Sequence, residues 1–321
     1  MKAIIYTEYG STDVLHLDEI EIPIPKANQV LIKVEAASLN KLDQVTYGGS
    51  SVMRLFSGNG WLKPKDQRLG TDLAGRVEAV GSAVTQLRPG DEVFGGGHGS
   101  FAEYACARQE YVTLKPANVS FAAAASLPVA GLTALQGLRD HGKIQAGQEV
   151  LIYGAGGGVG TFAVQIAKAM GAKVTAVCGP HNVERMRSLG ADEVIDYTQE
   201  DLSKHRARYD LIAAVNGYQS IQSYQRALKP QGICVVMGGA LRQVAQSLLL
   251  GPLLSKRGGQ QLGFMGIAKF NQSDMLILRE LLETGKISPV IDRCYPLSET
   301  PQALRYMEAG HTQGKVVITV A

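Results

Sequence analysis

The stretch VLIYGAGGGVGTFAVQIAKAMGAKVTAVCGPH, residues 150–181, decides the fold of this chain. It begins with a short apolar run, passes through five glycines in seven positions at 154–160, and continues with the apolar spacing of a helix. A second apolar run follows at 173–178. This order of strand, glycine-rich turn, helix and strand predicts a βαβ unit in a parallel sheet.

The rest of the chain places this unit in the middle of a larger fold. Further strands alternating with a helix are predicted up to about residue 239, whereas the first 120 residues contain short alternating segments broken by Gly and Pro. A helix near 275–285 and a final strand, GKVVITV, complete the pattern. We predict an α/β fold in which a Rossmann domain with a doubly wound parallel sheet, residues 123–255, is inserted into a β-rich domain of residues 1–122 and 256–321.

The glycine turn predicts a site for the phosphates of a dinucleotide. Backbone N–H groups at a helix N-terminus attract an anion, and glycines let it approach the backbone closely. The usual GxGxxG spacing fails at its third position, but glycines at 154, 157 and 160 can serve the tight turn, the pyrophosphate contact and the helix packing. A strand–helix turn without a ligand is the alternative. The predicted loop contacts are Gly154, Ala155, Gly156, Gly157, Gly158, Val159 and Gly160.

The region after the second strand favours NADPH over NADH. An NAD site places an acid near the end of this strand to bind the ribose 2′-hydroxyl, and no Asp or Glu occurs from Thr161 to Val183. The missing acid and nearby cations predict a 2′-phosphate site, although these cations could also be ordinary surface charges. The cations are Lys173, His181, Arg185 and Arg187. The predicted contacts in this region are Cys178, Gly179, His181, Arg185 and Tyr197.

Composition argues against several other classes of protein. The net charge is +3 without a long basic run, so no nucleic-acid partner is expected. No apolar stretch approaches the roughly 20 residues of a membrane span, and the first residues read as a strand rather than a signal peptide. The four cysteines are widely spaced without a CxxC pair, which predicts reduced thiols and a cytoplasmic location.

Several segments together resemble the zinc-independent quinone oxidoreductases of the medium-chain dehydrogenase/reductase superfamily. They include VLIKVEAASLNKLD near the start, LGTDLAGRVEAVGSAV and RPGDEVFG after it, ASLPVAGLTALQGL before the glycine turn, and LGADEVIDY and QGKVVITV beyond it. The resemblance covers essentially the whole chain. It implies a GroES-like catalytic domain made of both chain ends, an inserted Rossmann domain, bound NADPH and a homodimer.

The positions that bind zinc in zinc-dependent members carry other residues here. Those members have a Cys in the SLN region and a Gly-His-Glu where this chain reads GTD, whereas this chain has Asn40 and Asp43 in the first stretch and Thr71 and Asp72 in the second. The four-cysteine lobe of a structural zinc is also missing. His98 is interpreted as a loop residue, so no metal site is predicted.

The resemblance also assigns roles to individual residues. It implies that Asn40 faces the nicotinamide and the substrate, although Asn40 could simply cap the segment after its strand. Thr133 matches a cofactor-contacting Thr, with packing against the sheet as the alternative. Tyr47 is a candidate proton donor, lying two residues beyond the usual position of the family's Tyr. Further cofactor contacts are predicted at Gly238, Gly239, Phe264 and Lys315.

Without zinc, reduction of an activated double bond is less demanding than alcohol oxidation, which needs a Lewis acid or a tuned base. We therefore expect NADPH-dependent reduction of quinones or α,β-unsaturated carbonyls. A zinc-free alcohol dehydrogenase and a non-catalytic NADPH-binding sensor are the alternatives. The apolar stretch 47–70, with the single tryptophan Trp61, is expected to cover the substrate or to contact a second subunit.

Overall fold

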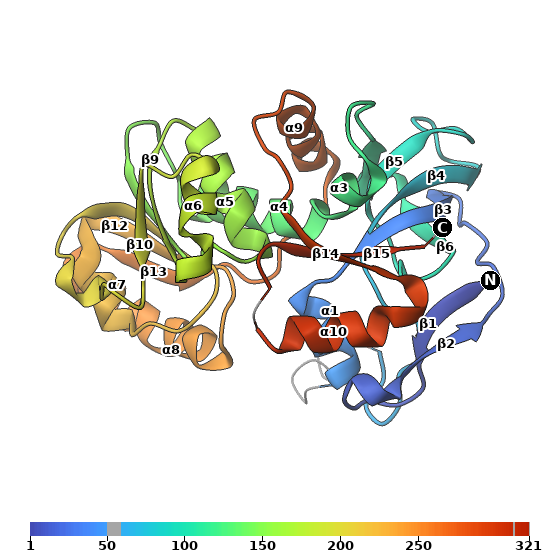
Figure 1. Cartoon of the computed structure of the whole chain (residues 1–321), viewed down its shortest axis with the longest axis horizontal. Helices are drawn as coiled ribbons and strands as arrows, with labels where there is room; N and C mark the ends of the chain where they lie inside the picture. Colours follow the sequence, from blue (N-terminus) through green and yellow to red (C-terminus); the bar gives the residue numbers. More distant parts are fainter. Residues whose placement is uncertain (50–58, 311, 321) are drawn as a thin grey trace. The chain divides into compact units, whose positions relative to one another are not determined.

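Figure 1 shows the chain as a computed structural model, which describes residues 1–49, 59–310 and 312–320. It divides into two units. Unit 1 comprises Met1–Val129, Phe270–Glu283 and Ile291–Ala321, and unit 2 comprises Ala130–Lys269 and Thr284–Val290. Unit 1 is thus built from both chain ends. Unit 2 starts at residue 130 rather than at the predicted 123 and extends to 269 rather than 255.

The central strand of unit 1 is β3 (Gln29–Ser38), on which Val30, Ile32 and Val34 alternate into the buried core. Over the described residues the main sheet has the order β14-β15-β3-β4-β5-β7, and β6 also pairs with β3. All pairs in it are antiparallel except β14 with β15. The other strands of unit 1 are β1 (Lys2–Tyr6), β2 (Leu15–Glu19), β4 (Asp72–Val80), β5 (Glu92–Gly96), β6 (Tyr104–Arg108), β7 (Val112–Leu114), β14 (Ile291–Pro296) and β15 (Lys315–Thr319).

The register of this sheet brings distant segments together at the end of β3. Ser38 pairs with Val317 on one side and with Asp72 on the other. Helix α1 begins directly beyond, with Asn40 as its N-cap residue. Strand β3 therefore ends beside the first residues of both β4 and β15. The helices of unit 1 are α1 (Lys41–Gly48), α3 (Phe121–Ala125), α9 (Gln272–Glu283) and α10 (Thr300–Glu308).

Unit 2 contains a parallel sheet with the order β10-β9-β8-β11-β12-β13 along the described chain. Strand β8 is buried on both faces at Val150, Leu151 and Ile152, as expected for a parallel strand covered by helices. The strand order reverses between β8 and β11, the place where such sheets bind ligands. The strands are β8 (Glu149–Tyr153), β9 (Lys173–Cys178), β10 (Glu193–Asp196), β11 (Tyr209–Ala214), β12 (Leu228–Val236) and β13 (Gln261–Phe264).

Helices α5 to α8 lie in the connections between these strands, and α4 precedes β8 (Figure 1). Helix α5 directly follows the glycine turn after β8, as the sequence predicts. The α/β fold with a doubly wound parallel sheet is therefore confirmed. The helices are α4 (Pro128–Gln136), whose first two residues belong to unit 1, α5 (Gly158–Ala169), α6 (Val183–Ser188), α7 (Ile221–Ala227) and α8 (Leu241–Gly258).

Candidate functional site

The glycine turn after β8 places three glycines in different environments. Gly154 has a left-handed backbone with φ +84°, and a Cβ there would lie 2.6 Å from the carbonyl oxygen of Asn216. A Cβ on Gly160 would lie 2.4 Å from the Gly154 oxygen, so this glycine lets α5 pack closely against the turn. Gly157 has φ −87°, and the nearest atom to a Cβ there is the Gly154 oxygen at 4.0 Å. The side of Gly157 is therefore open.

This open side fits the phosphates of a dinucleotide. It adjoins the N-terminus of α5, whose first turn carries no acidic residue. The first N–H groups of a helix have no partners within it, so they attract an anion. Ala155 and Gly156 are buried, whereas Gly158 and Val159 are partly exposed with Gly157. A side chain on Gly157 would occupy this open side.

The end of β9 brings together three further predicted contacts. Cys178 is buried, and burial together with the nearby Asp196 carboxylate raises the pKa of its thiol to about 11. A Cβ on Gly179 would lie 3.1 Å from the hydroxyl oxygen of Tyr197, whose side chain is exposed. The thiol therefore belongs to the core, and Gly179 and Tyr197 form the accessible part of this region.

Asn182 is a residue of this region that the sequence analysis missed. Its Nδ2 atom lies 2.6 Å from the position of a Cβ on Gly156, so its amide packs directly against the glycine turn. The Nη1 group of Arg185 donates a hydrogen bond of 2.9 Å to the Asn182 Oδ1 atom. His181 next to it is exposed. Asn182 thus links the predicted cation Arg185 to the turn.

Of the four predicted cations, Lys173 lies away from this region and Arg187 is paired with a carboxylate. Lys173 is the first residue of β9 and Cys178 the last, so Lys173 lies at the opposite end of the strand, where its Nζ atom pairs with Glu149 at 3.4 Å. Arg187 forms an ion pair with Glu184. The prediction that they lie near the 2′-phosphate was therefore wrong for Lys173, and Arg187 already has a carboxylate partner.

An acid also lies closer to this region than the sequence window indicated. Asp196 ends β10 and is paired in register with Cys178 on β9. Its Oδ1 atom accepts hydrogen bonds from the backbone N and the Oγ1 atom of Thr198, at 2.9 and 2.8 Å. The window from residue 161 to 183 did not include Asp196, because Asp196 ends the next strand, β10.

The predicted glycines after β12 adjoin the end of β11. Gly239 has φ +102°, and a Cβ there would lie 2.8 Å from the Gly217 carbonyl oxygen. A Cβ on Gly238 would lie 3.0 Å from the Val215 oxygen. Their lack of side chains therefore lets the chain pass closely over the segment that follows β11, at the same edge of the sheet as the glycine turn.

Two other predicted contacts of unit 2 are partly exposed and adjoin the core. Thr133 lies on α4 between the buried residues Leu132 and Ala134. Phe264 ends β13 and packs against a buried cluster that includes Val236. Core packing thus accounts for part of the Phe264 side chain.

In unit 1 a group of buried polar side chains forms around one carboxylate. The Asp72 Oδ2 atom accepts hydrogen bonds from Ser38 Oγ and Asn40 Nδ2, both at 2.9 Å, and lies 3.5 Å from Lys315 Nζ. The Lys315 ammonium donates to Asn40 Oδ1 at 2.7 Å and to the Leu39 carbonyl oxygen at 2.8 Å. We call Ser38, Asn40, Asp72 and Lys315 the Asp72 cluster.

Burial shifts the pKa values of the charged members of this cluster. Asp72 is 0% exposed, and burial raises the pKa of its carboxyl although Lys315 opposes the shift. Burial lowers the pKa of Lys315, and Asp72 opposes that shift. Because removal of either charge would leave the other buried without its partner, the two charges depend on each other.

Asp43 is a neighbouring buried carboxyl with its own shift. Its Oδ2 atom accepts a hydrogen bond of 2.7 Å from the backbone N–H of Asn40, at the start of α1. Burial raises the pKa of Asp43 to about 7, the Asn40 bond lowers it, and the charge of Asp72 raises it. Asp43 therefore titrates near neutral pH, which its sequence position did not indicate.

Tyr47, the predicted proton donor, lies in the core of unit 1. Its side chain is 1% exposed, and its hydroxyl donates a hydrogen bond to Glu308 Oε1. Burial and the Glu308 contact raise the pKa of the Tyr47 hydroxyl well above its usual value. The structure thus places Asn40 and Lys315 together, whereas the Tyr47 hydroxyl is engaged by Glu308.

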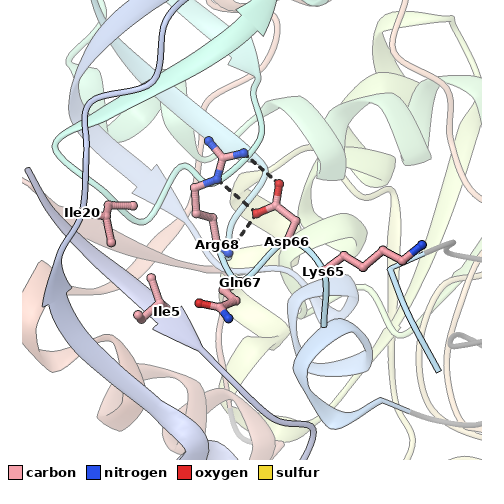
Figure 2. Close-up of a pocket in the computed structure, with 6 residues that line it drawn as sticks. All are labelled: Ile5, Ile20, Lys65, Asp66, Gln67 and Arg68. Carbon is pink, nitrogen blue, oxygen red and sulfur yellow. Dashed lines mark hydrogen bonds and ion pairs between the residues drawn. The ribbon is translucent and has the colours of Figure 1, made fainter. Parts of the chain in front are cut away.

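Part of the stretch 47–70 lies outside the described residues, including Met53, Leu55 and Phe56. Of the rest, Trp61 and Leu62 are exposed. The end of this stretch, residues 65–68, lines an open surface pocket of about 300 Å³. Figure 2 shows the lining residues Ile5, Ile20, Lys65, Asp66, Gln67 and Arg68. It contains none of the predicted site residues. Asp66 is held there by Arg68 at 2.7 Å and by His98 at 2.6 Å.

The donor set in unit 1 does not fit zinc. Asn40 and Asp72 stand at the positions compared with zinc ligands, and the Lys315 ammonium contacts both of their side chains. In the described part of the chain, no group of three His, Cys, Asp or Glu side chains could hold a metal ion. No helix among the described residues is long and apolar enough to cross a membrane.

Comparison with known proteins identifies the family. Residues 26–117 match the alcohol dehydrogenase GroES-like domain, and residues 189–318 match the zinc-binding dehydrogenase family. The chain is 37% identical to the 2-methylene-furan-3-one reductase of Solanum lycopersicum, covering 99% of this chain and 79% of that protein. The quinone oxidoreductase structure from Coxiella burnetii has a TM-score of 0.87 at 33% identity, covering 100% and 99% of the two chains. The chain belongs to the quinone oxidoreductase family of the medium-chain dehydrogenase/reductase superfamily.

As a member of this family, the chain is an oxidoreductase enzyme with a GroES-like domain and a Rossmann domain. A further relative is the chloroplastic NADPH-dependent alkenal/one oxidoreductase of Arabidopsis thaliana, 34% identical over 99% of this chain and 79% of that protein. These relatives support a nicotinamide cofactor and a small-molecule substrate.

Proposed function

We propose that this quinone oxidoreductase reduces quinones or α,β-unsaturated carbonyls with NADPH and without zinc. The observation that carries the proposal is the Asp72 cluster. Asn40 and Asp72 stand where zinc-dependent members have metal ligands, and the Lys315 ammonium contacts both of their side chains. The site thus offers a fixed cation and a fixed amide in place of a metal-ligand set.

The nicotinamide cofactor would be held chiefly by unit 2. The open side of Gly157 and the N-terminus of α5 accept its pyrophosphate, and Gly238 and Gly239 leave room over the end of β11. Thr133 and Phe264 are proposed as further contacts. When bound, NADPH supplies the hydride for reduction of the activated double bond.

Unit 1 contributes polar groups rather than a metal. Reduction of an enone or quinone develops negative charge on the carbonyl oxygen, and a hydrogen-bond donor or a nearby cation stabilises such charge. Asn40, with its amide held by Asp72 and Lys315, is the proposed contact to the nicotinamide and the substrate. Because the Tyr47 hydroxyl is bound to Glu308, it could serve as proton donor only by exchanging that bond, and water is the simpler source.

The preference for NADPH rests on the surface beyond β9. The Tyr197 hydroxyl lies beside Gly179, and Arg185 and His181 are the cations of that region. The relative from Arabidopsis thaliana is named as NADPH-dependent, which supports the same choice. The Asp196 carboxylate works against it, although Asp196 accepts two hydrogen bonds from Thr198.

The proposal extends to a homodimer in the cytoplasm. The homodimer follows from the family resemblance. The cytoplasmic location is supported by the described cysteines, which are all free thiols as expected in a reducing compartment. Sedimentation of the purified chain at micromolar concentration tests the first point, with a mass of twice 34.3 kDa as the expected result.

The test of the function is oxidation of NADPH and of NADH by a panel of quinones, enones, aldehydes and ketones. We expect turnover with quinones or enones, faster at limiting NADPH than at limiting NADH. The same preparation is analysed for zinc, and we expect far less than one zinc per chain. Activity confined to alcohol–carbonyl interconversion would contradict the proposal, and so would tight NADPH binding without turnover on any acceptor.

A further inference from the structure

A single carboxylate ties four distant segments of unit 1 together. Asp72 is the first residue of β4, and its Oδ2 atom accepts from Ser38 at the end of β3 and from Asn40 at the start of α1. Lys315, the first residue of β15, lies 3.5 Å from the same oxygen. The other oxygen, Oδ1, accepts a bond of 2.9 Å from the backbone N–H of Val129, in the first turn of α4. A surface ion pair would not have so many buried partners.

These contacts allow only one orientation of the Asn40 amide. Its NH2 group donates to the Asp72 carboxylate and its oxygen accepts from the Lys315 ammonium. A rotated amide would set NH2 against the ammonium and the oxygen against the carboxylate, and both contacts would be repulsive. At 7% exposure, Asn40 has little water to compensate for the loss.

We propose that Asp72 is a positioning residue for the reaction: its buried carboxylate holds the Asn40 amide in one orientation, directly and through Lys315. The inference rests on the proposed function, in which Asn40 contacts the nicotinamide and the substrate. It also revises the expectation for Lys315. The ammonium donates to Asn40 and Leu39 and faces Asp72, so Lys315 acts through Asn40 rather than by reaching the cofactor itself.

The competing explanation is that Asp72 only fastens β4 to the start of α4. The substitution Asp72→Asn separates the two explanations. An Asn can still accept from Val129 through its oxygen, so it preserves the fastening. Its NH2 group would instead face the NH2 group of Asn40 and the ammonium of Lys315, which removes the positioning contacts.

Asp274→Asn is a matched control. Asp274 is an equally buried carboxylate of unit 1, 2% exposed, and it accepts a hydrogen bond of 2.8 Å from Asn271 at the start of α9. It lies outside the Asp72 cluster. The same chemical change there should reduce thermal stability to a similar extent without affecting the reaction.

The experiment measures kcat, the KM for NADPH, NADPH affinity by fluorescence and thermal unfolding. The variants are Asp72→Asn, Asp274→Asn, Lys315→Met, and the double variant that combines Asp72→Asn with Lys315→Met. We expect Asp72→Asn to lower kcat roughly 10- to 100-fold while NADPH affinity stays within about threefold, because unit 2 carries most of the binding. The kcat of the double variant should lie within about threefold of the kcat of the less active single variant, because both substitutions act through Asn40. Unchanged kcat in Asp72→Asn, or fully additive losses, would overturn the inference.

A second readout does not depend on turnover. In protein labelled with ¹⁵N-asparagine, the side-chain amide signal of Asn40 is assigned by its loss in Asn40→Ala. It should shift in Asp72→Asn and in Lys315→Met but not in Asp274→Asn. An unchanged signal in Lys315→Met would overturn the inference even if Asp72→Asn failed to fold. If the unmodified enzyme reduced no acceptor, the proposed function would fail, and this signal would still decide whether Asp72 positions Asn40.

Discussion

The glycine turn of unit 2 and the Asp72 cluster of unit 1 are built in opposite ways. The turn is a local stretch of seven residues, and its chemistry comes from backbone groups and from the space beside Gly157. The Asp72 cluster joins side chains from residues 38, 40, 72 and 315, and its chemistry comes from two buried charges around an amide. Under the proposed function, the first region governs cofactor binding and the second governs the reaction.

The largest effect is expected from Gly157→Val. The backbone at Gly157 (φ −87°) accepts a valine, so the substitution tests the space alone. We expect NADPH affinity to fall at least about 100-fold, or roughly 2.7 kcal/mol. Fluorescence titration measures it. Gly263→Val on β13, where a Cβ meets no atom within 4 Å, is the control and should bind NADPH normally. Normal affinity in a folded Gly157→Val enzyme would mean that the pyrophosphate lies elsewhere.

A smaller effect is expected at the end of β9, where side chains rather than backbone groups make the proposed contacts to the cofactor. Gly179→Asp would place a carboxylate beside the Tyr197 hydroxyl and repel a 2′-phosphate. A charge-assisted hydrogen bond contributes about 1.5–3 kcal/mol, so the preference for NADPH over NADH should fall at least about tenfold. Ratios of kcat/KM for the two cofactors at low salt measure it.

Lys173→Ala is the matched control for this change, since Lys173 lies at the other end of β9 and pairs with Glu149. The ratio should not change in that variant. Equal use of NADH and NADPH by the unmodified enzyme would remove the electrostatic basis for the 2′-phosphate site.

The next prediction concerns pH and belongs to unit 1. Because burial raises the pKa of Asp43 to about 7, the folded chain holds this proton more tightly than the unfolded chain between about pH 4 and 7. Its contribution to stability is therefore greatest at low pH and is lost as the pH rises through 7. The charged or titratable groups that act with it are Asp72, Lys315 and Tyr47.

Asp43→Asn removes this titration. Between pH 5 and 8 the unmodified protein should lose roughly 1–3 kcal/mol of unfolding free energy relative to the variant. Urea unfolding at both pH values measures the difference. A pH-independent difference between the two proteins would show that Asp43 does not titrate in this range.

The smallest effect is expected from Tyr47→Phe. Loss of the hydrogen bond to Glu308 should cost about 1 kcal/mol of stability, and kcat should stay within about threefold. Thermal unfolding and steady-state rates measure the two quantities. A fall in kcat of about 100-fold at unchanged stability would instead restore Tyr47 as the proton donor and would extend the reaction site beyond the Asp72 cluster.

The same contrast explains what could be predicted from the sequence. The parallel sheet and the glycine turn follow from local patterns, because strand, turn and helix are contiguous at residues 150–170. Asp196 was overlooked because the ends of β9 and β10 are compared only once the strand register is known. Lys173 was misplaced although it begins the predicted strand 173–178, whose other end carries the site.

The Asp72 cluster could be predicted only in part. The resemblance pointed to Asn40 and Lys315 separately, and Asp72 was noted only as a residue in place of a zinc ligand. Their contact depends on the register in which Ser38 pairs with both Asp72 and Val317, which no local pattern encodes. The burial that raises the pKa of Asp43 likewise arises from tertiary packing.

The most direct measurement follows deuterium from NADPH carrying deuterium at both positions on C4 of the nicotinamide into the product of an enone. Proton and deuterium NMR of the product locate the label. We expect it at the β-carbon of a saturated ketone, since the site in unit 1 holds a fixed amide and ammonium rather than a set of zinc ligands. Deuterium at the carbonyl carbon of an alcohol would identify an alcohol dehydrogenase, and absence of the label from every product would identify a protein that binds the cofactor without using it.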